Sequence, residues 1–140
     1  MSLQAVLLPL FVQVALSLAL LAWFGALRVR DVRSGRVHPR DVALREPNWP
    51  KQTTQVGNCA QNQLELPLLF YVLTILAWIT RQADLLFVIM AWVFVILRLI
   101  HAYIHVTDNN LARRGMVFIT GAAVLTVMWI IFMLRILFAI

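Results

Sequence analysis

Long apolar runs dominate the pattern along the chain, and shorter polar stretches separate them. The apolar residues are not spread at the spacing of a soluble core, and four runs approach the ~20 residues that a helix needs to cross a bilayer. The pattern predicts membrane-spanning helices at residues 5–27, 58–79, 85–106 and 114–138. The expected fold is therefore all-α, an antiparallel four-helix membrane bundle in which one domain covers residues 1–140.

The three connections between these helices differ in length and chemistry. The first, 28–57, is long and contains Gly35 and three prolines, so continuous helix is not expected there. The second, 80–84, is short and predicts an antiparallel helical hairpin. The third, 107–112, is rich in aspartate and asparagine, which favour turns and helix caps.

Composition supports a membrane location. The chain is 62% hydrophobic and 13% charged, which is too little charge to cover the surface of a soluble domain of this length. No basic residue precedes the first apolar run, and the run is longer than the core of a secretory signal peptide, so a retained anchor is expected. The single cysteine, Cys59, excludes an intrachain disulfide framework.

The basic residues are unevenly distributed between the connections. The net charge is +6, and seven of the twelve basic residues lie within 28–57. Arg113 and Arg114 lie at the third connection, whereas the second holds only Arg81, opposed by Asp84. This positive-inside pattern predicts that both termini are outside and that the first and third connections are cytoplasmic, as in a bacterial inner membrane. It favours contact with anionic membrane lipids over a nucleic-acid partner.

Two polar stripes enter the predicted membrane region, one at the start of the second helix and one at the end of the third. Their members are Asn58, Asn62 and Glu65 on the second helix and Arg98, His101 and His105 on the third. Spacings of three and four residues put each stripe on one helix face. If the second helix enters the membrane near Asn58 and the third leaves it near Thr107, Glu65 and Arg98 would each lie about 10–14 Å below that membrane surface. Opposite charges at equal depth predict a buried structural ion pair.

An intramembrane glutamate is also what a small proton-coupled exporter would need. An exporter carboxylate works best without a permanent counter-ion, and Arg98 is available to Glu65. The sequence therefore favours a pair that fixes helix register over a transport site.

His101 and His105, four residues apart, share a face that could hold a metal or a haem. A zinc site needs three or four ligands, and only Glu65 is an obvious further candidate. We expect no metal, and we expect each histidine to hydrogen-bond a neighbouring group.

The order and spacing of these polar segments resemble the MAPEG family, the membrane-associated proteins in eicosanoid and glutathione metabolism, which include the microsomal glutathione transferases. Segment 62–65, Asn-Gln-Leu-Glu, followed by Pro67 and Phe70, is similar to the family's second-helix motif. Segment 98–101, Arg-Leu-Ile-His, followed by His105, resembles its third-helix motif.

The resemblance extends to both ends of the chain. Arg114, with Phe118 and Gly121 after it, looks like the family's fourth-helix arginine and its trailing residues. Arg30 or Arg33, ahead of a proline, resembles the basic exit of the first helix.

This resemblance implies a homotrimer that holds glutathione between neighbouring subunits near the cytoplasmic side, while a lipophilic small molecule arrives through the membrane. The implied activity is conjugation or reduction of lipophilic electrophiles by the glutathione thiolate. A basic connection would attract the anionic tripeptide. A thiol that is mostly protonated at neutral pH needs a nearby cation or donor to favour its thiolate. Arg114 is the candidate for this catalytic role.

The remaining expected site residues would contact glutathione. Asn62 and Glu65 would bind polar groups of the peptide, with Arg30 or Arg33 near its carboxylates. The full expected binding set is Asn62, Glu65, Arg30, Arg33, Arg113, His101 and His105.

Two positions depart from the family's pattern. Asn58 stands where many members have arginine, and His105 stands where a tyrosine is usual. A non-catalytic membrane scaffold or lipid-binding protein of the same fold is therefore the alternative to the enzyme.

Overall fold

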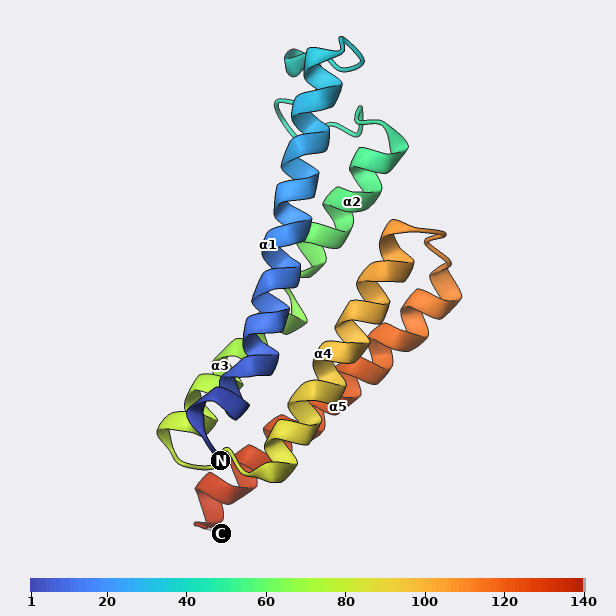
Figure 1. Cartoon of the computed structure of the whole chain (residues 1–140). Helices are drawn as coiled ribbons and strands as arrows, with labels where there is room; N and C mark the ends of the chain where they lie inside the picture. The colour runs from blue at the N-terminus through green and yellow to red at the C-terminus, as the bar shows by residue number, and fades with distance from the viewer. Residues whose placement is uncertain (140) are drawn as a thin grey trace.

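The computed structural model describes residues 1–139, and these residues form helices without any strand (Figure 1). Both termini lie at one end of an elongated bundle (Figure 1). Residues 34–50 lie at the opposite end, and the turn at residues 107–110 lies toward it; we call this part of the molecule the loop end. Four segments are long and apolar enough to cross a membrane. The predicted all-α class and four segments able to span a membrane are thereby confirmed for residues 1–139.

Helix α1, Leu3–Arg33, is longer than the apolar run that predicted it. Its 31 residues extend about 46 Å, so its last turns project beyond a hydrocarbon core of about 30 Å. Hydropathy marks where the membrane ends, not where the helix ends, and arginine is a good helix former. The helix stops where Gly35 adopts a φ of 76°, the left-handed conformation common just past a helix C-terminus.

The second spanning segment is two helices, α2 (Lys51–Asn62) and α3 (Leu66–Ile79). We expected continuous helix from residue 58, but α2 begins directly after Pro50. The helix is then interrupted at residues 63–65, because Pro67 has no amide hydrogen to donate to the carbonyl of residue 63 and its ring crowds that carbonyl. The expectation that Asn62 and Glu65 share one helix face is therefore wrong.

Buried glutamines stabilise this interruption. The Gln63 side-chain amide donates to the Cys59 carbonyl at 3.0 Å and accepts from Gln13 Nε2 of α1 at 3.0 Å. These contacts satisfy polar groups that the break leaves inside the bundle, where water is absent.

Helices α4 (Leu85–Val106) and α5 (Leu111–Phe138) form the most extensive helix pair (Figure 1). Side chains cap both N-termini: Asp84 Oδ1 accepts from the Phe87 amide at 2.9 Å, and Asn110 Oδ1 accepts from the Arg113 amide at 3.1 Å. Such caps satisfy amide groups that have no partner within the helix. With 22 residues, α4 extends about 33 Å, close to the thickness of the hydrocarbon core.

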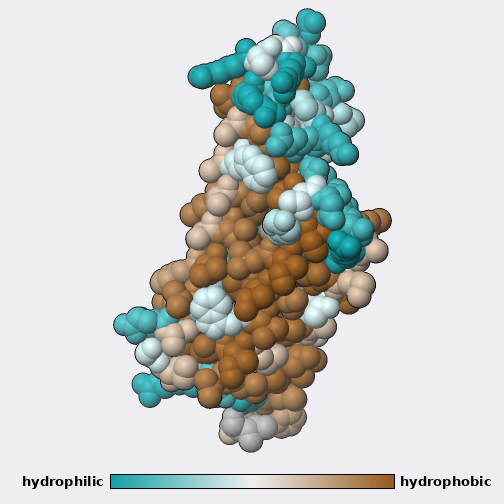
Figure 2. Space-filling view, turned by 45° about the vertical axis from the view of Figure 1, so that its right-hand side comes forward, coloured by the Kyte–Doolittle hydropathy of each residue, from teal (hydrophilic) through white to brown (hydrophobic). Residues whose placement is uncertain are grey.

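The core lies between α1, α3, α4 and α5 and consists of apolar side chains. Phe70 and Phe94 pack at its centre with ring centroids 4.8 Å apart. On the face shown in Figure 2, the surface is hydrophilic at the loop end and mostly apolar from the middle of the molecule to the end that holds the termini, with scattered hydrophilic residues there. A surface of this kind suits contact with lipid.

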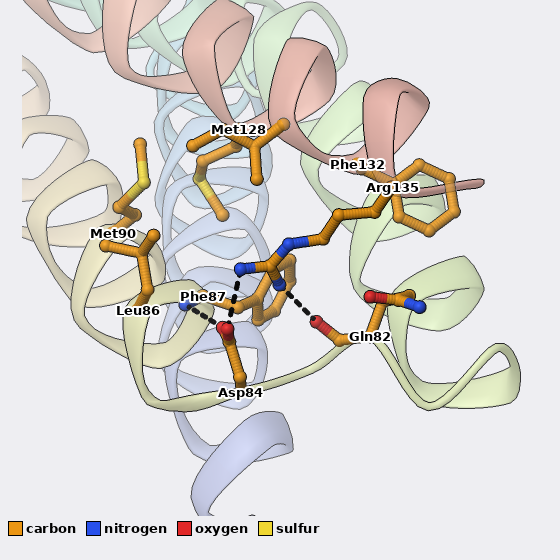
Figure 3. Close-up of a pocket in the computed structure, with 9 residues that line it drawn as sticks. Gln82, Asp84, Leu86, Phe87, Met90, Met128, Phe132 and Arg135 are labelled. Atoms are coloured by element: carbon orange, nitrogen blue, oxygen red, sulfur yellow. Dashed lines mark hydrogen bonds and ion pairs between the residues drawn. The ribbon is translucent and has the colours of Figure 1, made fainter. Parts of the chain in front are cut away.

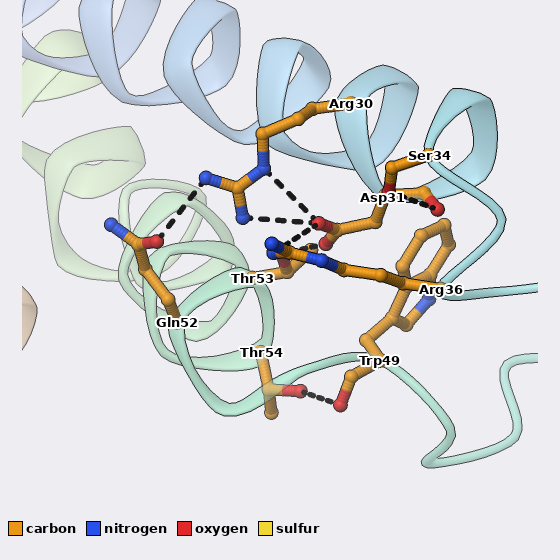
Figure 4. A network of polar contacts seen from close by, with 8 residues as sticks. All are labelled: Arg30, Asp31, Ser34, Arg36, Trp49, Gln52, Thr53 and Thr54. Carbon is orange, nitrogen blue, oxygen red and sulfur yellow. Dashed lines mark hydrogen bonds and ion pairs between the residues drawn. The ribbon is translucent and has the colours of Figure 1, made fainter.

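A buried carboxylate joins α1 to α2 at the loop end (Figure 4). Asp31 is 0% exposed. Its Oδ2 accepts a hydrogen bond from the Thr53 hydroxyl, and its Oδ1 accepts from Arg30 Nη2 at 3.0 Å. Arg36 Nη1 lies 3.9 Å from the same Oδ1. Both carboxylate oxygens therefore have donors, as burial of a charge requires.

A second ion pair, between Arg135 and Asp84, lies at the end of the bundle that holds the termini (Figure 3). Arg135 Nη2 of α5 donates to Asp84 Oδ2 at 2.7 Å, and Arg135 Nη1 donates to the Gln82 carbonyl at 3.4 Å. These contacts fix α5 to the turn between α3 and α4. The cavity beside them is only about 20 Å³, too small for an organic ligand.

Candidate functional site

A cavity of about 310 Å³ lies at the loop end where α2, α4 and α5 meet. It gathers four of the predicted site residues from three helices: Asn62, His101, His105 and Arg114. The connection 107–110 turns the chain between α4 and α5, so it brings the end of one helix beside the start of the other.

The two histidines form one buried wall of this cavity. His101 is 2% exposed and His105 is 6% exposed, and their rings are nearly perpendicular with centroids 5.5 Å apart. Phe118 of α5 packs against His101 at 5.8 Å. The Nδ1 atom of each histidine is buried and has no hydrogen-bond partner within residues 1–139, whereas we expected each histidine to hydrogen-bond a neighbouring group.

Arg98 lies directly behind Asn62. Its side chain is 1% exposed, and its Nη2 donates to the Asn62 side-chain oxygen and, at 3.5 Å, to the Asn62 carbonyl. Asn62 Nδ2 in turn donates to Glu65 Oε2 at 3.1 Å. A guanidinium, an amide and a carboxylate thus form a chain in which Asn62 is the middle member.

The predicted direct ion pair between Glu65 and Arg98 is not formed within the described chain. The interruption after α2 carries Glu65 to the N-cap of α3, where it is exposed. Asn62 occupies the position beside the guanidinium instead. Two nitrogens of Arg98, Nε and Nη1, consequently have no partner among the described residues.

The adjacent arginines at the start of α5 have different surroundings. Arg114 is half-buried on the cavity, and its Nη1 donates to Asn109 Oδ1 at 2.5 Å. The Arg113 side chain is 71% exposed and lies 3.7 Å from Asp108. Both belong to the first turn of α5, where the helix dipole favours an anion. Only Arg114 can present its charge to the cavity.

A model of the MAPEG family matches residues 6–134 of the 140-residue chain. The chain belongs to the MAPEG family. No curated protein and no solved structure matches the chain. Family membership, together with the four apolar segments, identifies an integral membrane protein of the family that includes membrane glutathione transferase-like and eicosanoid-metabolism proteins.

Several residues expected in the site lie away from this cavity of the MAPEG chain. Arg30 pairs with Asp31 and reaches Gln52 Oε1 at 3.5 Å. Arg33 lines a different groove beside α1. Glu65 and Arg113 are exposed near the cavity without lining it. Asn58, the departure from the family pattern, is exposed and lines another hollow.

Sequence reasoning gave no site role to four residues that line the cavity: Leu111, Gly115, Phe118 and Ile119. Their signal was present: Leu111 and Phe118 lie three residues before and four after Arg114, and Gly115 and Ile119 follow Leu111 at intervals of four, so these residues form one stripe along α5. Within residues 1–139, no three histidine, cysteine, aspartate or glutamate side chains are grouped as a metal site would need.

Proposed function

We propose that this MAPEG protein is a membrane-bound, glutathione-dependent transferase-like enzyme that conjugates or reduces lipophilic electrophiles. The observation that carries the proposal is the cavity that brings Arg114 to the buried His101–His105 pair and Asn62. Its volume is at the lower end of the range for small-molecule sites, about 300 Å³ and above.

The electrostatics of the cavity favour an anion. Its lining contains Arg114 and no acidic side chain, and the N-terminal end of α5 adds a partial positive charge. A cation beside a bound thiol stabilises the thiolate, and each unit by which the thiol pKa falls corresponds to about 1.4 kcal/mol of that preference. The thiolate sulfur would then form a bond to an electrophilic carbon, the bond from that carbon to its leaving group would break, and the leaving group would depart as an anion, while the former thiol proton goes to water.

Polar side chains that line the cavity would supply the contacts that hold the peptide. His101, His105 and Asn62 are among the lining residues, and Asn62 is oriented by Arg98. A side chain that is already held in position loses little freedom on binding, which favours affinity and specificity.

We propose a homotrimer as the working form, with glutathione between neighbouring subunits. One copy leaves Glu65 exposed beside its cavity and holds Arg30 and Arg33 elsewhere. A second copy is the source from which such groups can complete the site. We also propose that both termini lie outside and the loop end lies in the cytoplasm of a bacterial inner membrane, because the loop end carries most of the basic residues.

The test is a titration of the purified protein in detergent with glutathione, following heat and thiolate absorbance together. Wild-type protein should bind glutathione and lower its thiol pKa. Arg114→Ala should abolish the thiolate signal while much of the peptide affinity remains, because activation and anchoring use different groups. Arg113→Ala is the matched control: it removes the same charge from the neighbouring, exposed position and should change little.

Two results would contradict the proposed enzymatic activity. Absence of saturable binding at millimolar glutathione would leave the non-catalytic scaffold or lipid-binding class. Binding with an unshifted thiol pKa would mark a glutathione site that lacks the activating step.

A further inference from the structure

A second hollow at the loop end lies between the last turns of α1 and the irregular segment 34–50. It is a groove of about 610 Å³. Its lining contains two arginines, Arg28 and Arg33, with Trp49, Gly25 and otherwise only valine, alanine and proline. We propose that this groove binds one anionic phospholipid, with the phosphate at the two arginines and an acyl chain along α1.

The groove lies at the level of the lipid headgroups. Helix α1 starts at Leu3, and about 20 residues of helix cross the hydrocarbon core. The second interface is therefore reached near Trp23, and Gly25 to Arg33 follow in the headgroup layer. Trp23 and Trp49 suit this level, because tryptophan is enriched where hydrocarbon meets water.

The charges of the groove are uncompensated, unlike those of the neighbouring arginines. Arg30 and Arg36 both pair with Asp31 (Figure 4). Within residues 1–139, neither Arg28 nor Arg33 has a carboxylate partner, and no acidic side chain lines the groove. A phosphate diester supplies the missing negative charge and accepts the planar hydrogen bonds of guanidinium groups.

Aromatic rings hold Arg28 in position. Its Cζ lies 4.7 Å from the centre of the Trp49 ring and 5.3 Å from the Phe24 ring. Cation–π contacts of this kind restrict a long side chain without neutralising it. The guanidinium is therefore oriented in advance for an anion.

An apolar track leads from the groove into the membrane. Leu18, Leu21, Gly25 and Val29 are spaced three and four residues apart on one face of α1. The three larger side chains are 62%, 50% and 51% exposed in that chain order. At Gly25, an added Cβ would meet no atom within 4 Å. The open space at this glycine connects the charged groove with the apolar stripe, as a bound lipid requires.

The experiment is native mass spectrometry of the detergent-purified protein with phosphatidylglycerol, and with phosphatidylcholine of the same chains as the neutral lipid. Wild-type protein should retain phosphatidylglycerol in preference to phosphatidylcholine. Arg28→Gln and Arg33→Gln should each weaken retention about fivefold, the effect of about 1 kcal/mol for one basic residue at a membrane surface. Arg40→Gln is the matched control, because it removes the same charge from the adjoining segment 34–50, at a position outside the groove lining, and should have no such effect.

A second pair of variants tests the groove without altering charge. Gly25→Leu fills the open space and should reduce lipid retention about as strongly as loss of one arginine. Ala26→Leu, at the next exposed position of the same helix, should not.

Several outcomes would overturn the proposal. Equal retention by wild-type protein and by Arg28→Gln, Arg33→Gln and Gly25→Leu would exclude the groove. Equal retention of the two lipids would exclude recognition of charge. Displacement of the lipid by soluble glycerol phosphate at equal concentration would identify a free-anion site. Lipid binding that appears only when subunits are separated would mean that a second copy of the chain covers the groove.

Discussion

Two buried charged side chains near the loop end differ in how many of their polar atoms have hydrogen-bond partners. Asp31 is 0% exposed and both of its oxygens accept hydrogen bonds, from Thr53 and Arg30. Arg98 is 1% exposed, but only its Nη2 has a partner, Asn62, within the described residues.

This difference distinguishes the fully hydrogen-bonded cluster around Asp31 from the partly hydrogen-bonded cluster around Arg98. A buried charge with all of its partners fixes the elements around it, whereas one without them is stable only where something else supplies the missing groups. Asp31 joins α1 to α2 and needs nothing further. Arg98 lies behind Asn62, which lines the cavity together with Arg114, and its Nε and Nη1 have no partner among the described residues.

The largest expected effect on stability is at Asp31, because both of its carboxylate oxygens accept hydrogen bonds. Asp31→Ala leaves the Thr53 hydroxyl without its acceptor and two arginines without their counter-ion. Hydrogen bonds to a charged group contribute about 1.5–3 kcal/mol, so the free energy of unfolding in detergent should fall by about 2 kcal/mol. Thermal unfolding measures this directly. Asp41→Ala, which removes an exposed partner of Arg40, is the control and should change little.

The intermediate effect is expected at Arg98, which lacks some of its hydrogen-bond partners. It should change glutathione affinity more than the free energy of unfolding. Arg98→Leu removes a buried cation with open donors, so the free energy of unfolding should stay within about 1 kcal/mol of wild type. Glutathione affinity should fall about tenfold, because Asn62 loses the donor that orients it. Calorimetric titration and thermal unfolding of the same preparation separate the two quantities.

Glu65→Gln is the matched control for Arg98→Leu, since Gln keeps an oxygen that can accept from Asn62. It should change both quantities less than Arg98→Leu does. A loss of several kcal/mol in the unfolding of Arg98→Leu would contradict the comparison and assign Arg98 to the structural class.

The smallest expected effect on stability concerns the ion pair between Asp84 and Arg135, at the end of the molecule that holds the termini. Burial opposes ionisation of Asp84, but hydrogen bonds from Arg135 and the Phe87 amide outweigh it and hold the pKa of this carboxyl below its ordinary value of 3.8. A lowered pKa stabilises the folded state above 3.8, and the stabilisation is lost as the pH falls through the folded-state pKa. Because the side chain is 46% exposed, the contribution should stay below about 1 kcal/mol.

Unfolding measured in detergent from about neutral pH down to about pH 3 should therefore decline less steeply for Asp84→Asn than for wild type. Asp108→Asn, at an exposed pair with Arg113, provides the comparison. An identical acid limb for Asp84→Asn and wild type would contradict the stabilising role of the Arg135 pair.

The spanning segments could be predicted from the sequence because apolar runs are required by the bilayer itself. The helix ends outside it could not. Arginines carry α1 on to Arg33 although hydropathy falls at residue 28. Pro67, used in the sequence only as part of a motif, also interrupts the helix before it, and that interruption depends on the partner that Gln13 provides from α1.

The cavity was partly predictable. His101, His105 and Arg114 follow from helical spacing and the family resemblance, and the short third connection brings them together. The contact between Arg98 and Asn62 was missed, because two opposite charges were assumed to pair directly. The interruption after α2 places the Asn62 amide beside Arg98 in place of the Glu65 carboxylate. The spacing of residues along the sequence does not predict this exchange.

The length of α4 has a consequence for where reactants meet. The helix is about as long as the hydrocarbon layer is thick, so His105, in its last turn, lies at the boundary between oil and water. Arg114 begins the return helix at the same boundary. A hydrophilic thiol and a hydrophobic electrophile partition into opposite phases, and this is the depth that each can reach without leaving its own solvent. Under the proposed function, the chain would act as a phase-transfer catalyst by geometry, because one helix ends where the two solvents begin to mix.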